Sequence, residues 1–179
     1  MTITLHRLTN LDMNDIEALA DVLMDVVEGG ASVSFMSPLS RDEARAFWNR
    51  VAVDAAAGER ALLVARDDSG RIVGTVQLVL AQPPNQPHRA DLAKLLVHRD
   101  ARRQGVAEAL MHAIEPVALA EGKWLLVLDT ASDTAERLYT RLGWTRVGTV
   151  PDFALLPQGG LCDTVFFFKS LKTPANPKD

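Results

Sequence analysis

A turn that combines two arginines with a glycine is the first part of the sequence whose residue types could do chemistry. The turn consists of Arg102, Arg103, Gln104, Gly105, Val106 and Ala107. It follows an apolar run at residues 95–97 and precedes apolar residues at helical spacing, so it lies where a helix begins. The first amides of a helix have no partner within it, and together with the helix dipole they attract anions. Because Gly105 has no Cβ, its backbone can approach a ligand closely. The turn therefore predicts a binding site for a phosphate-bearing anion.

Strand and helix signals alternate along the chain and predict one α/β domain. Strands are predicted at residues 3–8, 61–65, 72–80, 91–97, 124–129, 144–150 and 165–171. Helices are predicted at residues 14–28, 41–57 and 133–142, and from Gly105 onward. This order predicts a three-layer fold in which helices cover both faces of one sheet. The domain is expected to span residues 1–172, followed by a disordered tail at residues 173–179.

Capping and helix-breaking residues refine the predicted helices. Asn14 is expected to cap the first helix. Ser40 and Glu43 have the spacing of a capping box at the start of the second helix. Pro116 removes a backbone donor from the helix that follows the glycine turn, which predicts a kink or break near Ala113.

Glycine and proline mark two further places in the chain. Gly74 falls inside a predicted strand, which indicates a bulge or the close approach of another element. A loop around Pro151 is expected to separate the last two strands.

Composition excludes several classes of function. The chain has 179 residues and a net charge of −4, which argues against nucleic acid as a main partner. The single cysteine, Cys162, allows no intramolecular disulfide and fits a reducing compartment. No apolar run reaches the ~18 residues that span a bilayer, and the first residues lack the apolar core of a signal peptide. The four histidines are scattered, so no metal site is predicted. These features predict a cytoplasmic protein.

Two motifs together resemble the GNAT family of N-acetyltransferases. They are Arg102-x-x-Gly105-x-Ala107 and Ala135-x-x-Leu138-Tyr139-x-x-x-Gly143-Trp144. The first is similar to the family's acyl-coenzyme-A signature and the second to its carboxy-terminal helix-and-strand motif. The likeness covers residues 2–171. A narrower likeness, to the tabtoxin-resistance group of acetyltransferases that act on an amino-acid-like toxin, lies at residues 29–33, 128–130 and 139–147 and at Pro151.

The family resemblance implies a fold and a co-substrate. The fold would be a mixed, mostly antiparallel sheet whose fourth and fifth strands splay apart. Acetyl-CoA would be the co-substrate, with no metal, and its pyrophosphate would lie on the amides of residues 104–107 beside Arg102 and Arg103. Its pantetheine arm would pair with the backbone of Leu95 and Val97, and the amide of Leu96 or Val97 would hold the thioester oxygen.

The resemblance also implies catalytic roles. Tyr139 falls where the family motif places its general acid, and a neutral phenol has a proton to give at neutral pH. Asp91 and Asp129, at strand ends that would flank the splay, are the candidate bases. Ser132 occupies a position that is asparagine in many members and would contact the cofactor. The three candidate catalytic residues also have structural alternatives: a half-buried aromatic for Tyr139, a solvated edge charge for Asp91, and a helix-capping or turn residue for Asp129.

The expected activity is transfer of an acetyl group from acetyl-CoA to the amine of a small molecule. An acidic cleft made by Asp91 and Asp129 would suit a cationic acceptor, and an amino-acid-like toxin or antibiotic is within this class. In the family, the loop at residues 31–39 would form one wall of the acceptor pocket; its alternative role is a connector packed on the core. Two other functions stay open: acetylation of a protein or peptide amine, and a non-catalytic module that senses acetyl-CoA. The expected partners are a small-molecule amine and a second copy of the chain, with no nucleic acid and no membrane.

Overall fold

The computed structural model describes residues 2–172, and the tail predicted at residues 173–179 lies outside them. The strands are β1 (Thr4–Leu8), β2 (Arg60–Arg66), β3 (Ile72–Val79), β4 (Arg89–Val97), β5 (Leu125–Thr130), β6 (Thr145–Leu155) and β7 (Leu161–Ser170). The helices are α1 (Met13–Glu28), α2 (Arg41–Ala56), α3 (Val106–Ala120) and α4 (Asp133–Arg141), with one 3₁₀ turn, η1 (Arg99–Ala101).

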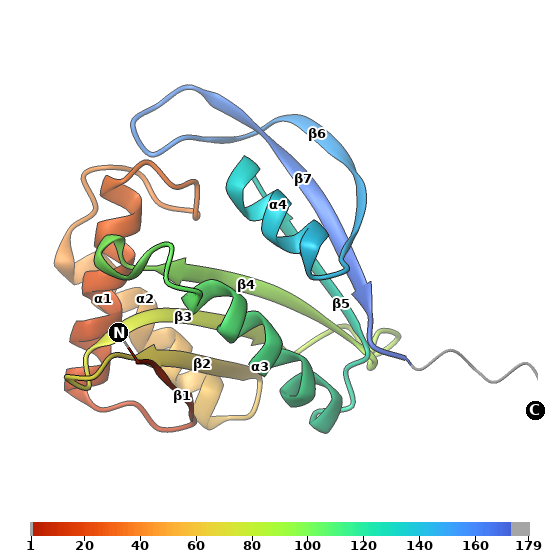
Figure 1. Cartoon of the computed structure of the whole chain (residues 1–179), viewed down its shortest axis with the longest axis horizontal. Coiled ribbons are helices and arrows are strands. Elements are labelled where there is room, and N and C mark those ends of the chain that lie inside the picture. Colours follow the sequence, from red (N-terminus) through yellow and green to blue (C-terminus); the bar gives the residue numbers. More distant parts are fainter. Residues whose placement is uncertain (1, 173–179) are drawn as a thin grey trace, which may run out of the picture.

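One seven-stranded sheet forms the middle layer, in the order β1-β2-β3-β4-β5-β7-β6. Every neighbouring pair is antiparallel except β4 and β5, which are parallel. The helices α3 and α4 pack on the core of one face, and α1 and α2 pack on the core of the other (Figure 1). The predicted three-layer, mostly antiparallel fold is confirmed.

The contact between β4 and β5 ends after three residue pairs. Arg89 lies opposite Leu125, and the last pair is Asp91 with Val127. Beyond that pair the two strands diverge, so the sheet opens in the middle while β4 stays paired with β3 and β5 with β7 (Figure 1). The expected splay between the fourth and fifth strands is therefore present.

The helices begin and end mostly where capping signals predict. Ser40 and Glu43 form the expected capping box at α2. At α1 the prediction is wrong: Asp12, not Asn14, is the cap, and it forms a box with Asp15. The carboxylate of Asp12 accepts a hydrogen bond from the amide of Asp15, the third residue of the helix. The helix therefore begins at Met13, one residue before the predicted start.

Pro116 does not break α3, so of the predicted kink or break near Ala113 the break is wrong. The helix runs without interruption from Val106 to Ala120 with Pro116 inside it. A proline at this position leaves the carbonyl of His112 without its helical donor. The side chain of His112 is 64% exposed, so this turn faces solvent and water can satisfy that carbonyl.

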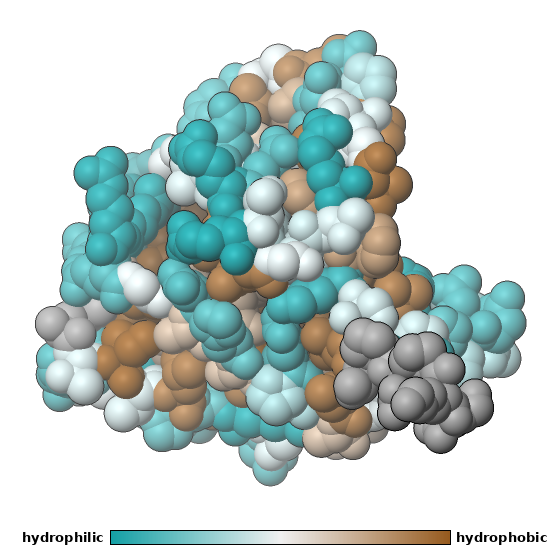
Figure 2. Space-filling view, turned by 45° about the vertical axis from the view of Figure 1, so that its right-hand side comes forward, coloured by the Kyte–Doolittle hydropathy of each residue, from teal (hydrophilic) through white to brown (hydrophobic). Residues whose placement is uncertain are grey.

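The β6–β7 hairpin is longer than predicted and includes Pro151. Pro151 lies within β6, where pairing with β7 is interrupted between Val150 and Ala154. β6 is an edge strand, which tolerates a residue without an amide donor. The hairpin exposes large apolar side chains, and Figure 2 shows hydrophobic surface on the part of the molecule that it forms. These side chains are Val147, Val150, Phe153, Leu155, Leu161 and Phe168.

Gly74 in β3 allows α3 to approach the sheet closely. A Cβ at this position would lie 2.9 Å from Cγ1 of Val106 and 3.2 Å from both Cδ1 of Leu110 and the carbonyl oxygen of Leu96. Val106 is the first residue of α3, so this contact sets the distance between the helix start and the sheet. Both alternatives predicted for Gly74 are observed, because the register of β3 with β2 also shifts beside it, where Ala65 lies opposite Gly74 and Arg66 opposite Ile72.

Gly74→Val should therefore lower the free energy of unfolding by about 1–3 kcal/mol, the usual cost of overpacking a core. Urea unfolding of both proteins measures the difference. Gly148→Val is the matched control, because a Cβ at Gly148 meets nothing within 4 Å. Equal losses in the two variants would show that α3 does not depend on this contact.

Candidate functional site

A cleft of about 1180 Å³ opens where β4 and β5 separate. Its lining comes from both sides of the sheet. On one side are the start of α3 and the inner side of α4, and on the other are the α1–α2 loop and the β6–β7 hairpin. The cleft therefore joins two faces of the molecule through the gap between the strands.

The mouth of the cleft on the α3 side contains unpaired backbone amides. Gly105 is the N-terminal cap of α3, has φ of 80°, and makes no side-chain cap. The first helical hydrogen bond runs from the amide of Ala109 to the carbonyl of Gly105, at 2.9 Å. Within residues 2–172 the amides of Val106, Ala107 and Glu108 make no backbone or side-chain hydrogen bond. A Cβ at Gly105 would meet nothing within 4 Å, and residues 105–108 all line the cleft, so a ligand in the cleft can reach this turn.

Two side chains of the turn form hydrogen bonds to nearby backbone carbonyls, and a third side chain forms none. Nε of Arg102 donates to the carbonyl of Val97 at 3.2 Å, and Nε2 of Gln104 donates to the carbonyl of Asp100 at 2.9 Å. Arg103 is exposed, has φ of 60°, and its side chain makes no hydrogen bond or ion pair to any residue the structure describes. Arg102 and Gln104 thus shape the turn, while Arg103 supplies a cation directed at solvent.

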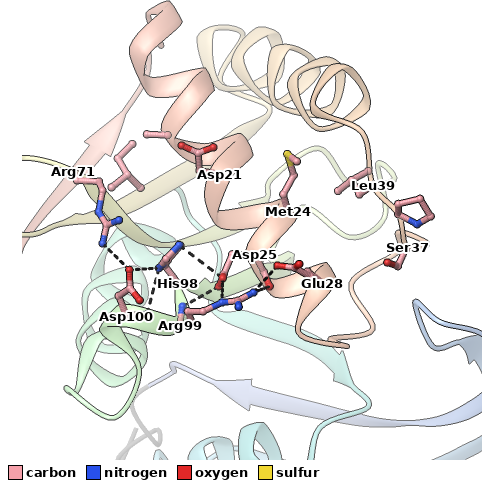
Figure 3. Close-up of a pocket in the computed structure, with 13 residues that line it drawn as sticks. Asp21, Met24, Asp25, Glu28, Ser37, Leu39, Arg71, His98, Arg99 and Asp100 are labelled. Carbon is pink, nitrogen blue, oxygen red and sulfur yellow. Dashed lines mark hydrogen bonds and ion pairs between the residues drawn. The ribbon is translucent and has the colours of Figure 1, made fainter.

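Asp25 of α1 holds the segment that leads into this turn (Figure 3). Its side chain is only 7% exposed and accepts a hydrogen bond from the amide of Arg99 at 2.8 Å and another from Nε of Arg99. Arg99 also pairs with Glu28 at 2.8 Å. These groups line a separate hollow of about 600 Å³ between α1 and η1. The sequence analysis did not select Asp25. The feature that could have identified it is an acidic residue among the buried apolar residues of α1.

The part of β4 beyond its last pair with β5 forms the floor of the cleft. Leu95, Leu96 and Val97 line it. Leu96 and Val97 pair with β3 on one side only, so their other edge faces the gap. The side chain of Leu96 is buried in the core beneath α1, so only its backbone is available to a ligand.

Tyr139 of α4 brings a phenol to the cleft. Its ring is 5% exposed and packs between Trp144 and Phe167, with centroid distances of 5.9 and 5.8 Å. Burial, and then the negative charge of Asp129, raise the pKa of the Tyr139 phenol well above its usual value. The phenol therefore keeps its proton at neutral pH. Ser132 caps this helix, because its Oγ accepts from the amide of Ala135 at 3.3 Å, and it also lines the cleft.

The structure places only one of the two candidate carboxylates in the cleft. Asp129 lines the cleft, and its Oδ2 accepts a hydrogen bond from the hydroxyl of Thr164 at 2.8 Å. Asp91 does not line it. Its oxygens bind the guanidinium of Arg89 and Nε2 of Gln82, the latter at 3.0 Å. The expectation of a cleft acidified by both residues therefore fails, because Asp91 belongs to the last paired position of β4 and is neutralised by Arg89.

The other side of the cleft contains residues that sequence reasoning did not select. Lys94 of β4 reaches it, and Cys162 of β7 lines it with Sγ 3.7 Å from Oγ of Ser32. Among residues 2–172 no group of three or more histidine, cysteine or acidic residues could hold a metal ion. In the same range no helix has the length and apolarity needed to cross a membrane.

Comparison with known proteins gives consistent matches. The sequence profile of the Acetyltransferase (GNAT) family matches residues 26–144. An N-acetyltransferase from Azospirillum brasilense, described as uncharacterized and encoded in the hisH-hisA intergenic region, is 35% identical over 129 residues, which cover 71% of this chain and 74% of that protein.

Solved structures share the fold at low sequence identity. A GNAT superfamily phosphinothricin acetyltransferase from Sinorhizobium meliloti, in complex with AcCoA, matches with a TM-score of 0.80 and 19% identity, covering 100% of this chain and 97% of that one. A ribosomal-protein-alanine N-acetyltransferase from Brucella melitensis matches with a TM-score of 0.76 and 20% identity, covering 96% and 100%. At these identities the likeness establishes the fold alone.

Asp25→Asn should loosen the segment between β4 and α3, since the neutral amide cannot form the charged pair with Arg99. We expect the hydrogen-bonded amides of residues 99–102 to exchange hydrogen faster. The free energy of unfolding should fall by about 1–2 kcal/mol. Hydrogen-exchange mass spectrometry and urea unfolding measure the two effects. Asp21→Asn is the control, because Asp21 makes only an exposed pair with Arg41 at 2.7 Å. Identical exchange in both variants would contradict the anchoring role.

Proposed function

Since the chain belongs to the GNAT family of acetyltransferases, we propose that it transfers the acetyl group of acetyl-CoA to the amine of a small molecule. One observation carries this proposal. A single cleft joins an open set of helix-start amides to a buried phenol and a carboxylate, through a gap between two strands. An acetyl transfer needs these three things: an anchor for a phosphate-bearing carrier, a group at the leaving sulfur and a group at the amine.

The residues present fit acetyl-CoA as co-substrate. The amides of residues 104–107 would hold its pyrophosphate, since Gly105, Val106 and Ala107 line the cleft and Gly105 presents no side chain. Arg103 would add positive charge, and Arg102 would contribute mainly by bracing the turn. The free edge of β4 at Leu95 and Val97 would pair with the pantetheine arm. The Ser132 hydroxyl, at the rim of the cleft, would lie beside it.

The proposed roles at the reacting atoms follow from the positions of two side chains. Asp129 would bind the acceptor's ammonium group and take its proton, directly or through water, so that the nitrogen can attack the thioester carbon. An amide of Leu96 or Val97 would hold the carbonyl oxygen as it gains negative charge. As the carbon–sulfur bond breaks, the phenol of Tyr139 would donate to the sulfur.

The raised pKa of the Tyr139 phenol makes it a weak proton donor to the leaving thiolate. A thiol has a pKa of about 8.5, which is lower than that of the buried phenol, so complete proton transfer from Tyr139 to the thiolate is uphill. Donation of a hydrogen bond has no such barrier. We therefore propose that Tyr139 stabilises the leaving thiolate chiefly as a hydrogen-bond donor, and that solvent delivers the proton afterwards.

The acceptor and the assembly are further parts of the proposal. The fold likeness to a phosphinothricin acetyltransferase supports the inclusion of amino-acid-like toxins and antibiotics among acceptors to be tested. The exposed apolar side chains of the β6–β7 hairpin support pairing of two copies through that surface, and light scattering of the purified protein measures the mass. The single cysteine, Cys162, supports a cytoplasmic location.

The activity is tested by following CoA release from acetyl-CoA with a panel of amines: free amino acids, amino-acid amides, phosphinothricin, simple alkylamines and short peptides. Turnover of small amines above the rate with acetyl-CoA alone is the expected result. If only peptides were acetylated, the acceptor would be a protein or peptide amine and not a small molecule. Tight cofactor binding without turnover of any amine would favour a sensing module instead.

Tyr139→Phe should lower kcat by about 10- to 100-fold, the cost of one hydrogen bond to a developing charge. Its affinity for acetyl-CoA should be nearly unchanged, because the ring still fills its place between Trp144 and Phe167. Steady-state kinetics and calorimetric titration measure the two effects. Thr140→Val, which removes the next hydroxyl of α4 outside the cleft, is the control. Full activity of the phenylalanine variant would remove Tyr139 from the chemistry.

A further inference from the structure

Lys94 occupies an unusual place in β4. Thr75 of β3 lies opposite Leu96 and Gln77 lies opposite Ala93, so two residues of β4, Lys94 and Leu95, fall opposite one residue of β3. This is a β-bulge, and Lys94 takes a left-handed conformation there with φ of 52°. Bulges and left-handed side-chain-bearing residues are costly and often serve to aim a side chain at a functional site.

The bulge directs Lys94 to the face of the sheet that carries α1 and α2. Its Nζ lies 5.9 and 5.7 Å from the ring centroids of Phe35 and Phe47, which belong to the core on that face. The helices α3 and α4, where the co-substrate would bind, pack on the opposite face. Lys94 therefore lies on the acceptor side of the gap between β4 and β5, and it lines the cleft.

The positive charge of Lys94 has no counter-charge beside it. Its Nζ donates to Oγ of Ser34 at 3.2 Å, and in the described part of the chain no carboxylate lies within 4 Å. Ser34 is itself left-handed, with φ of 75°, so the two strained residues contact each other. Burial lowers the pKa of the Lys94 ammonium, while the charge of Asp129 opposes that change. A half-buried cation with only a hydroxyl and two ring faces around it is incompletely stabilised.

Asp129 lines the same cleft as Lys94 and Tyr139. Its negative charge opposes the lowering of the Lys94 pKa by burial and adds to the rise of the Tyr139 pKa that burial causes. Asp163 also lines the acceptor side, whereas Asp91 does not. The acceptor side thus combines two carboxylates, Asp129 and Asp163, with the lysine Lys94. This arrangement matches a molecule with an ammonium group at one position and an anion at another.

We propose that Lys94 binds the carboxylate of the acceptor, so that the acceptor is a zwitterionic, amino-acid-like amine with its nitrogen at Asp129 and its carboxylate at Lys94. This inference rests on the proposed acetyltransferase function and narrows its substrate class. Lys94 is then a specificity-determining residue. It selects which amines are bound and does not take part in bond making.

The test compares pairs of acceptors that differ only in the anionic group. Free α-amino acids are assayed against their carboxamides and methyl esters, at a pH where both amines are adequately deprotonated, by CoA release. The expected result for the unaltered protein is a kcat/KM about 10- to 100-fold higher for the carboxylates, the range of one charge-assisted hydrogen bond. Most of the difference should lie in KM.

Lys94→Met keeps the apolar stem against Phe35 and Phe47 and removes the charge. It should raise KM for the carboxylates and reduce the carboxylate-to-carboxamide ratio towards one. Lys94→Arg should retain most of the ratio, which a role in packing alone would not predict. Lys123→Met removes a lysine charge just before β5, outside the cleft, and should leave the ratio unchanged. Thermal unfolding of each variant checks that the fold is kept.

The outcomes separate this inference from the proposed function. Turnover of amines with no preference for the carboxylate, or a preference that survives in Lys94→Met, would overturn the role of Lys94 and leave the acetyltransferase activity in place. Binding of acetyl-CoA with no turnover of any amine in the panel would remove the proposed function, and the inference with it.

Discussion

The early end of the pairing between β4 and β5 is the constraint on which the site depends. After the pair of Asp91 and Val127, neither strand bonds to the other. The exposed edge of β4 would be costly inside a sheet, because its amides and carbonyls need partners. A ligand that runs along the gap can satisfy them. The same opening connects the amides at the start of α3 on one face with Asp129 and Lys94 on the other.

Packing contacts keep this opening in a fixed shape. Because Gly74 has no Cβ, α3 packs closely against β3, and this contact places the first turn of the helix at the mouth of the cleft. Asp25 ties the segment before α3 to α1 through Arg99. The cap made by Ser132 fixes the start of α4 and thereby the place of Tyr139. None of these contacts touches the reacting atoms, yet together they set the distances on which catalysis by positioning depends.

The sequence predicted features that local residue patterns encode. The glycine turn, the capping box at Ser40, the order of strands and helices and the family were all readable, because each depends on residues close in the chain. The register of strand pairing could not be predicted from the sequence. Asp91 was expected in the cleft, but its pairing with Val127 and its contact with Arg89 are set by strands distant in sequence. The bulge that turns Lys94 into the cleft likewise depends on β3 and leaves no local signal.

The most direct test of the account is the thermal unfolding midpoint with and without excess acetyl-CoA. The open amides at the start of α3 should bind it, and a ligand at about 100 times its dissociation constant adds roughly 2.7 kcal/mol of stability. A clear rise in the midpoint is predicted. The rise should be lost in Gly105→Val, because a β-branched residue is strained at φ of 80° and its side chain enters the ligand's space. No rise in the unaltered protein at millimolar acetyl-CoA would contradict the central claim that this cleft is an acetyl-CoA site.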